Sequence, residues 1–238
     1  MKKKLAILSP RRTQRGFTLV ELSIVLVIVA LLVGGMLISI GTQREVANGN
    51  EMQKRLNDVR DALIGFAVTY GRLPCPANPA LVSGAAGAGV EIVPVVGGCT
   101  GGVLAGVLPW ATLGLPELDT WERRLSYRVT GIFAQPITGQ AAFALNNDGD
   151  LTVRVTAGGT TVATLIPAVV VSHGPNGLGA WLPTGGQMAA SADGDEIENT
   201  NADVNFVSKA FTPTFDDQVV WVPPTILKNR MVAAQKLP

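Results

Sequence analysis

The sequence is poor in histidine, cysteine and charge, and each shortage excludes a class of protein. Its 238 residues include one histidine and two cysteines, too few for a metal site built from several histidines or from four thiolates. Charged residues form 16% of the chain, against about 25% in soluble proteins. The formal net charge of +1 argues against a nucleic-acid binder that works through an overall basic field.

The hydrophobic fraction, in contrast, is 47%, with aromatic residues at only 5%. Intrinsic disorder requires low hydrophobicity and high net charge, so we expect most of the chain to fold. The length fits one domain of ordinary size, or one domain with an anchoring segment.

The small net charge hides an asymmetry between the N-terminus and the rest. Residues 1–16 carry a charge of +6 and no acid, and without them the chain has 13 basic and 18 acidic residues, a net charge of −5. The six basic residues are Lys2, Lys3, Lys4, Arg11, Arg12 and Arg15. We therefore treat residues 1–16 as a separate leader.

Residues 17–40 form an apolar run with a single charge, Glu21. As a helix, 24 residues span about 36 Å, enough for a bilayer core of about 30 Å. A buried core helix is the alternative, but the run is too long and too apolar on every side for a domain of this size. The run predicts a membrane helix, and the basic leader places the N-terminus in the cytoplasm and the rest across the membrane.

A disposable secretory signal peptide is a second alternative for this segment. Its small-residue cleavage site would follow the apolar region, at residues 34–35 or 39–41. The length of the apolar run and the acid near its start argue against it.

Residues 16–21, GFTLVE, resemble the class III signal of type IV prepilins and type II secretion pseudopilins. The match includes the basic leader, Gly16, Phe17, the acid four residues after Phe17 and the unbroken apolar helix. The resemblance implies that a prepilin peptidase cleaves after Gly16 on the cytoplasmic side and that Phe17 is then N-methylated. It also implies a single-pass protein of the bacterial inner membrane with a periplasmic C-terminal domain, later part of a pilus or pseudopilus.

A carboxylate deep in a bilayer costs about 2.5–3.5 kcal/mol. We therefore expect Glu21 to have a specific role in this apolar helix. Cleavage after Gly16 would create an amine on Phe17, which Glu21 could pair with at i,i+4 spacing. In a filament, the resemblance implies that Glu21 faces the amine of a neighbouring subunit. The alternative is a carboxylate at headgroup level, where the start of the helix dipole favours it.

Residues 41–71 continue as an amphipathic stem helix. Apolar residues recur at spacings of three and four, which predicts one buried stripe. The stripe consists of Leu56, Val59, Leu63, Phe66 and Tyr70. Residues 48–50 are a weak point for the helix, and Gly71 with Pro74 and Pro76 ends it. We expect the stripe to pack on a sheet.

Residues 72–238 predict an exported, β-rich globular domain, so the fold class is α+β: a pilin-like long N-terminal helix packed on an antiparallel sheet. Residues 77–108 are rich in glycine and read as a loop with short extended pieces. Strands are expected at 126–129 and 218–222, with another apolar run at 161–171. Residues 141–145 and 151–155 predict a hairpin around an Asx/Gly turn, and residues 226–236 a short helix.

Cys75 and Cys99 bracket most of the glycine-rich loop. If the C-terminal part is exported, two cysteines in an oxidising compartment most simply form a disulfide. A reactive or metal-binding pair is the alternative.

Three phrases of the exported part, residues 118–127, 171–177 and 215–221, resemble pseudopilin-like proteins. The first two are similar to the Asp-Pro-Trp-Gly…Tyr and Ser-x-Gly-x-Asp-Gly patterns of major pseudopilins. The departures are Thr120 for proline, Glu122 for glycine and Asn176 for aspartate.

Residues 193–198 are acidic and rich in oxygen ligands, which suit Ca²⁺. The resemblance to major pseudopilins, which carry a calcium-stabilised loop in a comparable position, implies a calcium site with Asp193 and Asp195. The alternative is a solvated acidic loop, because the spacing is not that of an EF-hand. Asp216 and Asp217 are expected in a turn before a strand, although they could join that site in space.

No other cofactor and no enzymatic activity are expected. His173 follows Ser172 directly, but adjacency in sequence does not create a nucleophile–base pair. The predicted protein is a structural subunit whose partners are the membrane, prepilin peptidase, other pilin or pseudopilin subunits and the inner-membrane assembly machinery. The alternative is a minor or tip pilin whose exported domain binds a substrate, a surface or DNA, although no aromatic–basic patch indicates nucleic acid.

Overall fold

The computed structural model describes residues 16–238, and residues 34–42 by their backbone alone. The predicted leader lies outside the described residues except for Gly16. The chain divides into two compact units, residues 1–44 and 45–238. Of the helices in the described residues, none is long and apolar enough to cross a membrane. Residues 34–40 of the predicted membrane segment lie among those whose side chains are not described.

The longest element is helix α1 (Leu19–Tyr70), which runs without a break through residues 48–50. Its end is set by Gly71, whose φ of +72° is the left-handed conformation that glycine adopts readily. The backbone also comes close at this point: a Cβ on Gly71 would lie 2.4 Å from the carbonyl oxygen of Gln140. The predicted end of the stem helix is therefore confirmed.

The main sheet has four strands in the order β3 (Ala105–Val107), β4 (Ser126–Val129), β7 (Ala168–Ser172) and β9 (Gln218–Trp221). All three pairings are antiparallel. The predicted strands at 126–129 and 218–222 are confirmed, the second of them up to Trp221. The edge strand β3 comes from the glycine-rich segment 77–108, so part of that predicted loop belongs to the sheet.

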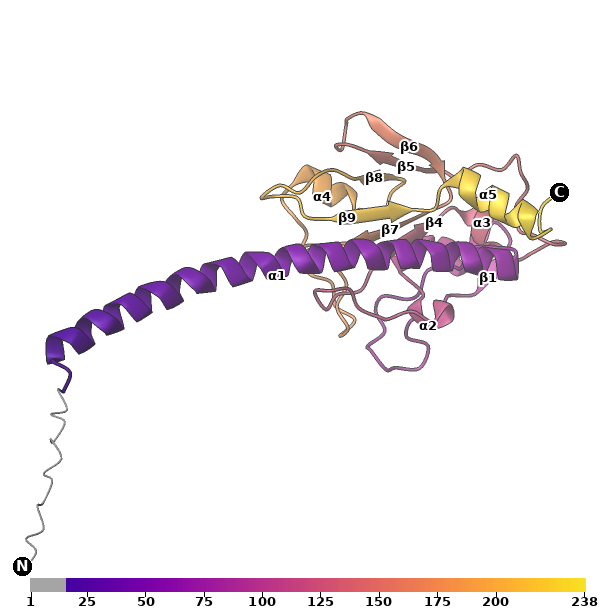
Figure 1. Ribbon diagram of the computed structural model, residues 1–238. Helices are drawn as coiled ribbons and strands as arrows, with labels where there is room; N and C mark the ends of the chain where they lie inside the picture. The colour runs from indigo at the N-terminus through magenta and orange to yellow at the C-terminus, as the bar shows by residue number, and fades with distance from the viewer. Residues whose placement is uncertain (1–15) are drawn as a thin grey trace, which may run out of the picture. The chain divides into compact units, whose positions relative to one another are not determined.

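Residues 45–70 of α1 lie along one face of this sheet (Figure 1). The stripe residues Leu56, Val59, Leu63 and Phe66 are buried as predicted, whereas Tyr70 is 56% exposed, which corrects the prediction for the last position. Additional buried residues widen the stripe. These are Met52, Ile64 and Ala67 from α1, and they share one core with Tyr127, Val129, Ala168, Val170, Val220 and Val222.

A second sheet covers the opposite face, with the strand order β6 (Thr161–Ile166), β5 (Leu151–Arg154) and β8 (Asn205–Val207). Its core joins Leu151, Val153 and Phe206 to Val169 and Val171 of β7. Strand β7 is therefore buried along its whole length, because successive side chains point to opposite faces and both faces are covered. The β5–β8 pair is parallel, an exception to the predicted antiparallel sheet within a fold that is α+β as predicted.

The predicted hairpin of 141–145 with 151–155 is wrong. Residues 141–145 form no strand, and β5 pairs instead with β6. Ala142 and Phe143 belong to the helix-side core, where Phe143 packs on Phe133 with ring centroids 4.4 Å apart. Their apolar character therefore reflects the burial of a loop, and not strand alternation.

The apolar run at 161–171 divides into β6 and β7, which lie in different sheets. Pro167 separates the two strands, and a proline cannot donate to a strand ladder. The C-terminal helix α5 (Pro224–Ala233) begins and ends slightly before the predicted 226–236, and buries Leu227 and Met231. The short elements are β1 (Pro94–Val95), β2 (Gly98–Cys99), a 3₁₀ turn (Thr100–Gly102), α2 (Trp110–Leu113), α3 (Gly131–Ala134) and α4 (Gly194–Glu198).

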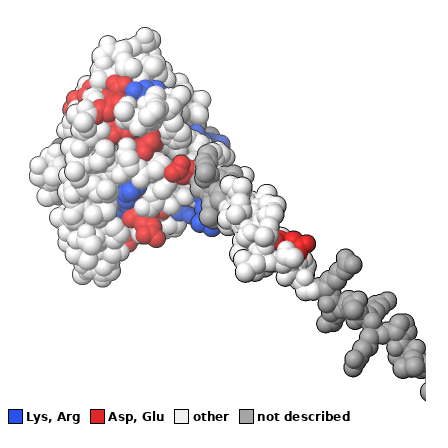
Figure 2. All heavy atoms as spheres, turned by 90° about the vertical axis from the view of Figure 1, so that its left-hand side faces the viewer, with Lys and Arg blue, Asp and Glu red and all other residues white. Residues whose placement is uncertain are grey.

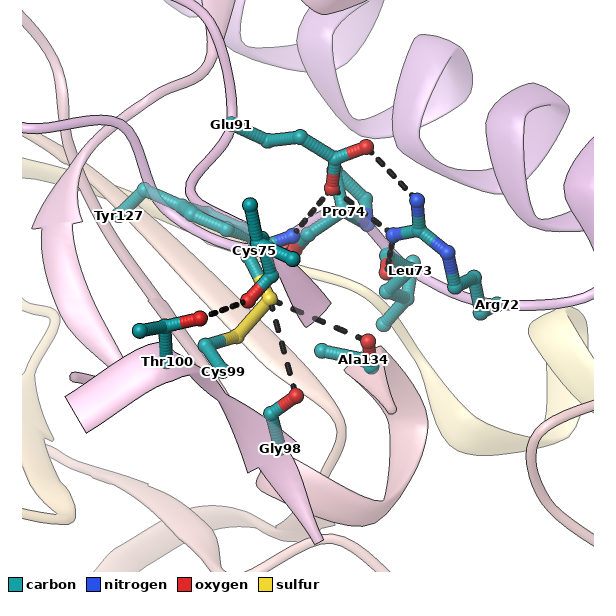
Figure 3. The surroundings of a disulfide bond; sticks show 11 residues. Arg72, Leu73, Pro74, Cys75, Glu91, Gly98, Cys99, Thr100, Tyr127 and Ala134 are labelled. Carbon is teal, nitrogen blue, oxygen red and sulfur yellow. Dashed lines mark hydrogen bonds and ion pairs between the residues drawn. A yellow bond between two sulfur atoms is a disulfide. The ribbon is translucent and has the colours of Figure 1, made fainter. Parts of the chain in front are cut away.

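Cys75 and Cys99 form a disulfide with Cα atoms 5.9 Å apart, and both are buried beside the end of α1 (Figure 3). An ion pair of Arg72 with Glu91, at 2.7 Å, lies next to it. Glu91 also accepts a hydrogen bond from the backbone N–H of Cys75 at 2.9 Å. The loop is thus attached to the end of α1 by a covalent bond and by a charge-assisted contact.

Replacing both cysteines by serine is expected to lower the free energy of unfolding by about 3 kcal/mol, because the reduced chain gains loop entropy when it unfolds. Urea denaturation of the full chain in mild detergent measures this. As a control, a reductant should destabilise the wild type by a similar amount and leave the double variant unchanged. Equal stability of variant and wild type would contradict the prediction.

Candidate functional site

The predicted processing residues lie at the start of α1. Gly16 and Phe17 precede the helix, and the Phe17 side chain is 87% exposed. The carbonyl oxygen of Thr18 accepts the first helical hydrogen bond, from Leu22 N at 3.1 Å, so Thr18 is the N-cap.

Glu21 and Thr18 form a capping box, in which each side chain bonds the backbone N–H of the other residue. The Thr18 hydroxyl oxygen accepts from Glu21 N at 3.2 Å, and the Glu21 carboxylate accepts from Thr18 N at 2.8 Å. This geometry agrees with the alternative of a carboxylate held at the helix start. Pairing with the Phe17 amine requires a cleaved chain and stays a prediction.

The helix that follows carries apolar side chains exposed on every side. Within residues 19–33 the large hydrophobic residues are 48–86% exposed in the described chain, and Figure 2 draws this stretch almost entirely in white, the colour of uncharged residues. They are Leu19, Val20, Leu22, Ile24, Val25, Leu26, Val27, Ile28, Val29, Leu31, Leu32 and Val33. An apolar surface of this extent indicates a segment that works in contact with lipid or other protein.

The three phrases that resemble pseudopilins converge in the folded unit 45–238. Asp119, from the first phrase, is buried and accepts from Trp121 N at 2.8 Å and Arg123 N at 3.0 Å. Its second carboxylate oxygen accepts from the hydroxyl of Ser172, in the second phrase, at 2.9 Å. Asp119 thereby shapes its own loop and joins it to the end of β7.

Further hydrogen bonds connect the second phrase to its neighbours. The Arg123 guanidinium donates to the carbonyl oxygens of Gly174 at 2.7 Å and Pro175 at 3.0 Å. Asn176 N donates to Asp216, in the third phrase, at 2.8 Å, and the Asn176 amide donates to Glu196 of α4 at 2.9 Å. Asn176, where the resembling pattern has aspartate, is therefore a connecting residue.

An acidic cluster lies at this junction, in which ligand oxygens of Glu196, Asp216 and Asp217 are all within 4.8 Å of one another. Glu196 is 1% and Asp217 3% exposed, while Asp216 is partly buried. Burial raises the pKa of Asp216 to about 6, with a further contribution from the charges of Glu196 and Asp217. Asp216 therefore lies where negative charge is unfavourable.

Asp193 and Asp195, the two predicted calcium ligands, form other contacts. Asp193 is the N-cap of α4 and accepts from Asp195 N at 2.9 Å. Asp195 forms an ion pair with Lys209 and accepts from Ala157 N at 2.7 Å. Adjacency in sequence predicts Asp193 and Asp195 as ligands, whereas the carboxylates that lie together are those of Glu196, three residues after the N-cap, and of the two residues before β9.

His173 is buried between Ser126 and Asp217. Its Nε2 lies 2.8 Å from the Ser126 hydroxyl, and its Nδ1 lies 3.6 Å from a carboxylate oxygen of Asp217. The second distance is too long for a hydrogen bond, so the arrangement lacks the base–acid contact by which a catalytic triad is recognised. Spatial neighbours of His173 are thus distant in sequence, and the adjacent Ser172 bonds Asp119 instead.

Comparison with protein families identifies the N-terminal segment. Residues 11–37 match the family model described as the prokaryotic N-terminal methylation motif, which is the signature of type IV pilins and pseudopilins. The chain therefore carries a type IV pilin-like prepilin motif, and Gly16, Phe17 and Glu21 lie within it. Neither the curated proteins nor the solved structures include a match to this chain.

Replacing Asp119 by alanine is expected to lower the free energy of unfolding by about 2–4 kcal/mol, because one buried and two partly buried donors lose a charged acceptor. Asp119→Asn keeps an acceptor oxygen and should recover part of the loss. Chemical denaturation of the full chain in detergent measures both. Asp58→Ala, at an exposed carboxylate of α1, is the control, and a loss no larger than that of the control would contradict the role of Asp119.

Proposed function

We propose that the protein is a structural subunit, a pilin or pseudopilin, of a type IV pilus or type II secretion filament. The observation that carries the proposal is the match of residues 11–37 to the N-terminal methylation motif. In this proposal prepilin peptidase cleaves after Gly16, Phe17 is methylated, and the inner-membrane machinery adds the subunit to a filament.

Cleavage after Gly16 would change the net charge of the subunit and place a new charged group close to Glu21. Removal of residues 1–16 takes away a charge of +6 and leaves a subunit of −5, and it exposes an amine at Phe17, one helical turn before Glu21. An amine and a carboxylate at this spacing form a favourable pair. The same two groups can instead pair between subunits, which would define the axial position of one helix against the next.

The exposed apolar side chains of residues 19–33 support polymerisation through α1. In a bilayer these side chains contact lipid, and in a filament they would contact the helices of other subunits, so assembly exchanges one apolar environment for another. The Cys75–Cys99 disulfide supports export of the unit 45–238, because disulfides persist in oxidising compartments.

Two variants of Glu21 separate its roles in capping and in charge pairing. Glu21→Ala removes both, while Glu21→Gln keeps an oxygen that can accept from Thr18 N and removes the charge. We expect both to enter the membrane normally and to reduce filament incorporation at least about tenfold, since loss of a buried pair that contributes about 1.4 kcal/mol or more changes an equilibrium tenfold.

Membrane fractionation measures insertion, and the subunit content of sheared filaments measures incorporation. Thr18→Val is the matched control, because it removes the hydroxyl of the capping box and retains the charge of Glu21. Wild-type incorporation of Glu21→Gln would contradict the charge pair, and wild-type incorporation of Glu21→Ala would contradict any role of Glu21 in assembly.

A further inference from the structure

A cavity of about 220 Å³ lies on the face of the main sheet that is turned away from α1. Ser126 and Arg128 of β4 point to this face, because Tyr127 and Val129 alternate with them and belong to the core against α1. The second sheet covers β7 next to β4, and the cavity lies beside its last strand, β8. Six of the residues that line it are Ser126, Arg128, Val169, Val171, Trp181 and Phe206.

Arg128 is the one charged residue among the described residues that line the cavity. Its Nη1 donates to the carbonyl oxygen of Ala202, and its Nε is buried without a hydrogen-bond partner. Within the described part of the chain Arg128 forms no ion pair. Arg124, four residues earlier, is paired with Glu117 at 2.7 Å. A partly buried guanidinium without a counterion is unfavourable, so the charge of Arg128 favours an anion in the cavity.

The other lining residues indicate the body of that anion. Val169 and Val171 of β7 pair with Arg128 and Ser126 and therefore point to the same face, and Phe206 and Trp181 add further apolar surface. One guanidinium offsets one negative charge, and its planar fork matches a carboxylate. The volume is below the roughly 300–1,000 Å³ of sites for drug-sized ligands, so a small acid with an apolar body fits.

The polar residues of the cavity wall are held by contacts outside it. The hydroxyl of Ser126 lies 2.8 Å from Nε2 of His173. The side chain of Asn199, which also lines the cavity, bonds the backbone of Val207 twice and donates to Asp217 at 2.8 Å. A wall fixed in this way loses little conformational freedom when a ligand binds.

We propose that this cavity binds a small free monocarboxylic acid with an aromatic or branched aliphatic body. The carboxylate pairs with the guanidinium of Arg128, and the body packs against Val169, Val171 and Phe206. The assignment does not depend on the proposed filament function, because every residue that it uses belongs to the unit 45–238. It is also separate from the acidic cluster of Glu196, Asp216 and Asp217.

Ligand-detected NMR on the full chain in mild detergent tests the proposal, with detergent alone as the blank. The probes are benzoate, phenylacetate and isovalerate, each compared with its neutral amide. We expect at least one acid to bind with a Kd of about 1 mM or below. Its amide should bind at least about tenfold more weakly, since a charge-assisted pair is lost. No binding by any of the three acids, or equal binding of acids and amides, would overturn the site.

Two substitutions locate the binding. Arg128→Gln removes the charge and should weaken binding of the acid at least about tenfold, without an effect on the amide. Arg154→Gln is the matched control, because Arg154 is also partly buried with an unpartnered Nε but does not line the cavity. Wild-type affinity in Arg128→Gln, or an equal loss in Arg154→Gln, would contradict the assignment. If Arg128→Gln does not fold, the comparison of acid with amide in the wild type decides.

A peptide distinguishes a free acid from a carboxylate at the end of a chain. Acetyl-Gly-Gly-Phe carries a carboxylate and an aromatic ring on a backbone for which a cavity of this volume has no room. It should bind at least about tenfold more weakly than phenylacetate, as expected when a ligand cannot be fully enclosed. Binding of the peptide as tight as that of phenylacetate would overturn the assignment to free acids.

Discussion

The packing of the second half of α1 against the four-stranded sheet is the contact on which the rest of the unit 45–238 depends. Side chains of residues 52–67 share one core with inward-facing residues of β4, β7 and β9. The opposite face of β7 packs on a second sheet, which makes β7 a central strand buried on both sides. The segments that carry Asp119, Asn176 and Asp217 all begin or end next to these strands, so the sheet brings them together.

The features predicted correctly from the sequence are those with a local physical cause. The spacing of apolar residues in the stem, Gly71 and the prolines at its end, and the strands at 126–129 and before Pro223 each leave a local pattern. The hairpin predicted at 141–155 is wrong because residues 141–145 are a buried loop and form no strand. The pattern of residues 151–155 also does not reveal their strand partners. Leu151 and Val153 do form a strand, but its neighbours come from residues 161–166 and 205–207. Likewise, Tyr70 has the spacing of the buried stripe of α1, yet it lies beyond the part of the helix that the core covers.

The candidate sites also differ in how far a local sequence pattern predicts them. Gly16, Phe17 and Glu21 could be found from sequence because the motif is contiguous and combines residue identity with spacing. The acidic cluster could be found only in part. Glu196 lies within the acidic stretch whose composition suggests calcium, and Asp216 and Asp217 are expected in a turn that could join that stretch in space. Which carboxylates converge depends on the face that α4 turns inward and on Asn176, an interaction between segments about 20 and 40 residues apart that no local pattern encodes.

The chain has an apolar helix start within a processing motif and a disulfide-linked α+β unit built on the rest of the same helix. We propose that it is a prepilin-type subunit. Mass spectrometry of the mature N-terminus, on protein purified from its native membrane, tests this most directly. We predict a chain that begins with N-methylated Phe17. A chain that retains residues 1–16, or one that begins near residues 36–42 as a secretory signal would produce, would contradict it.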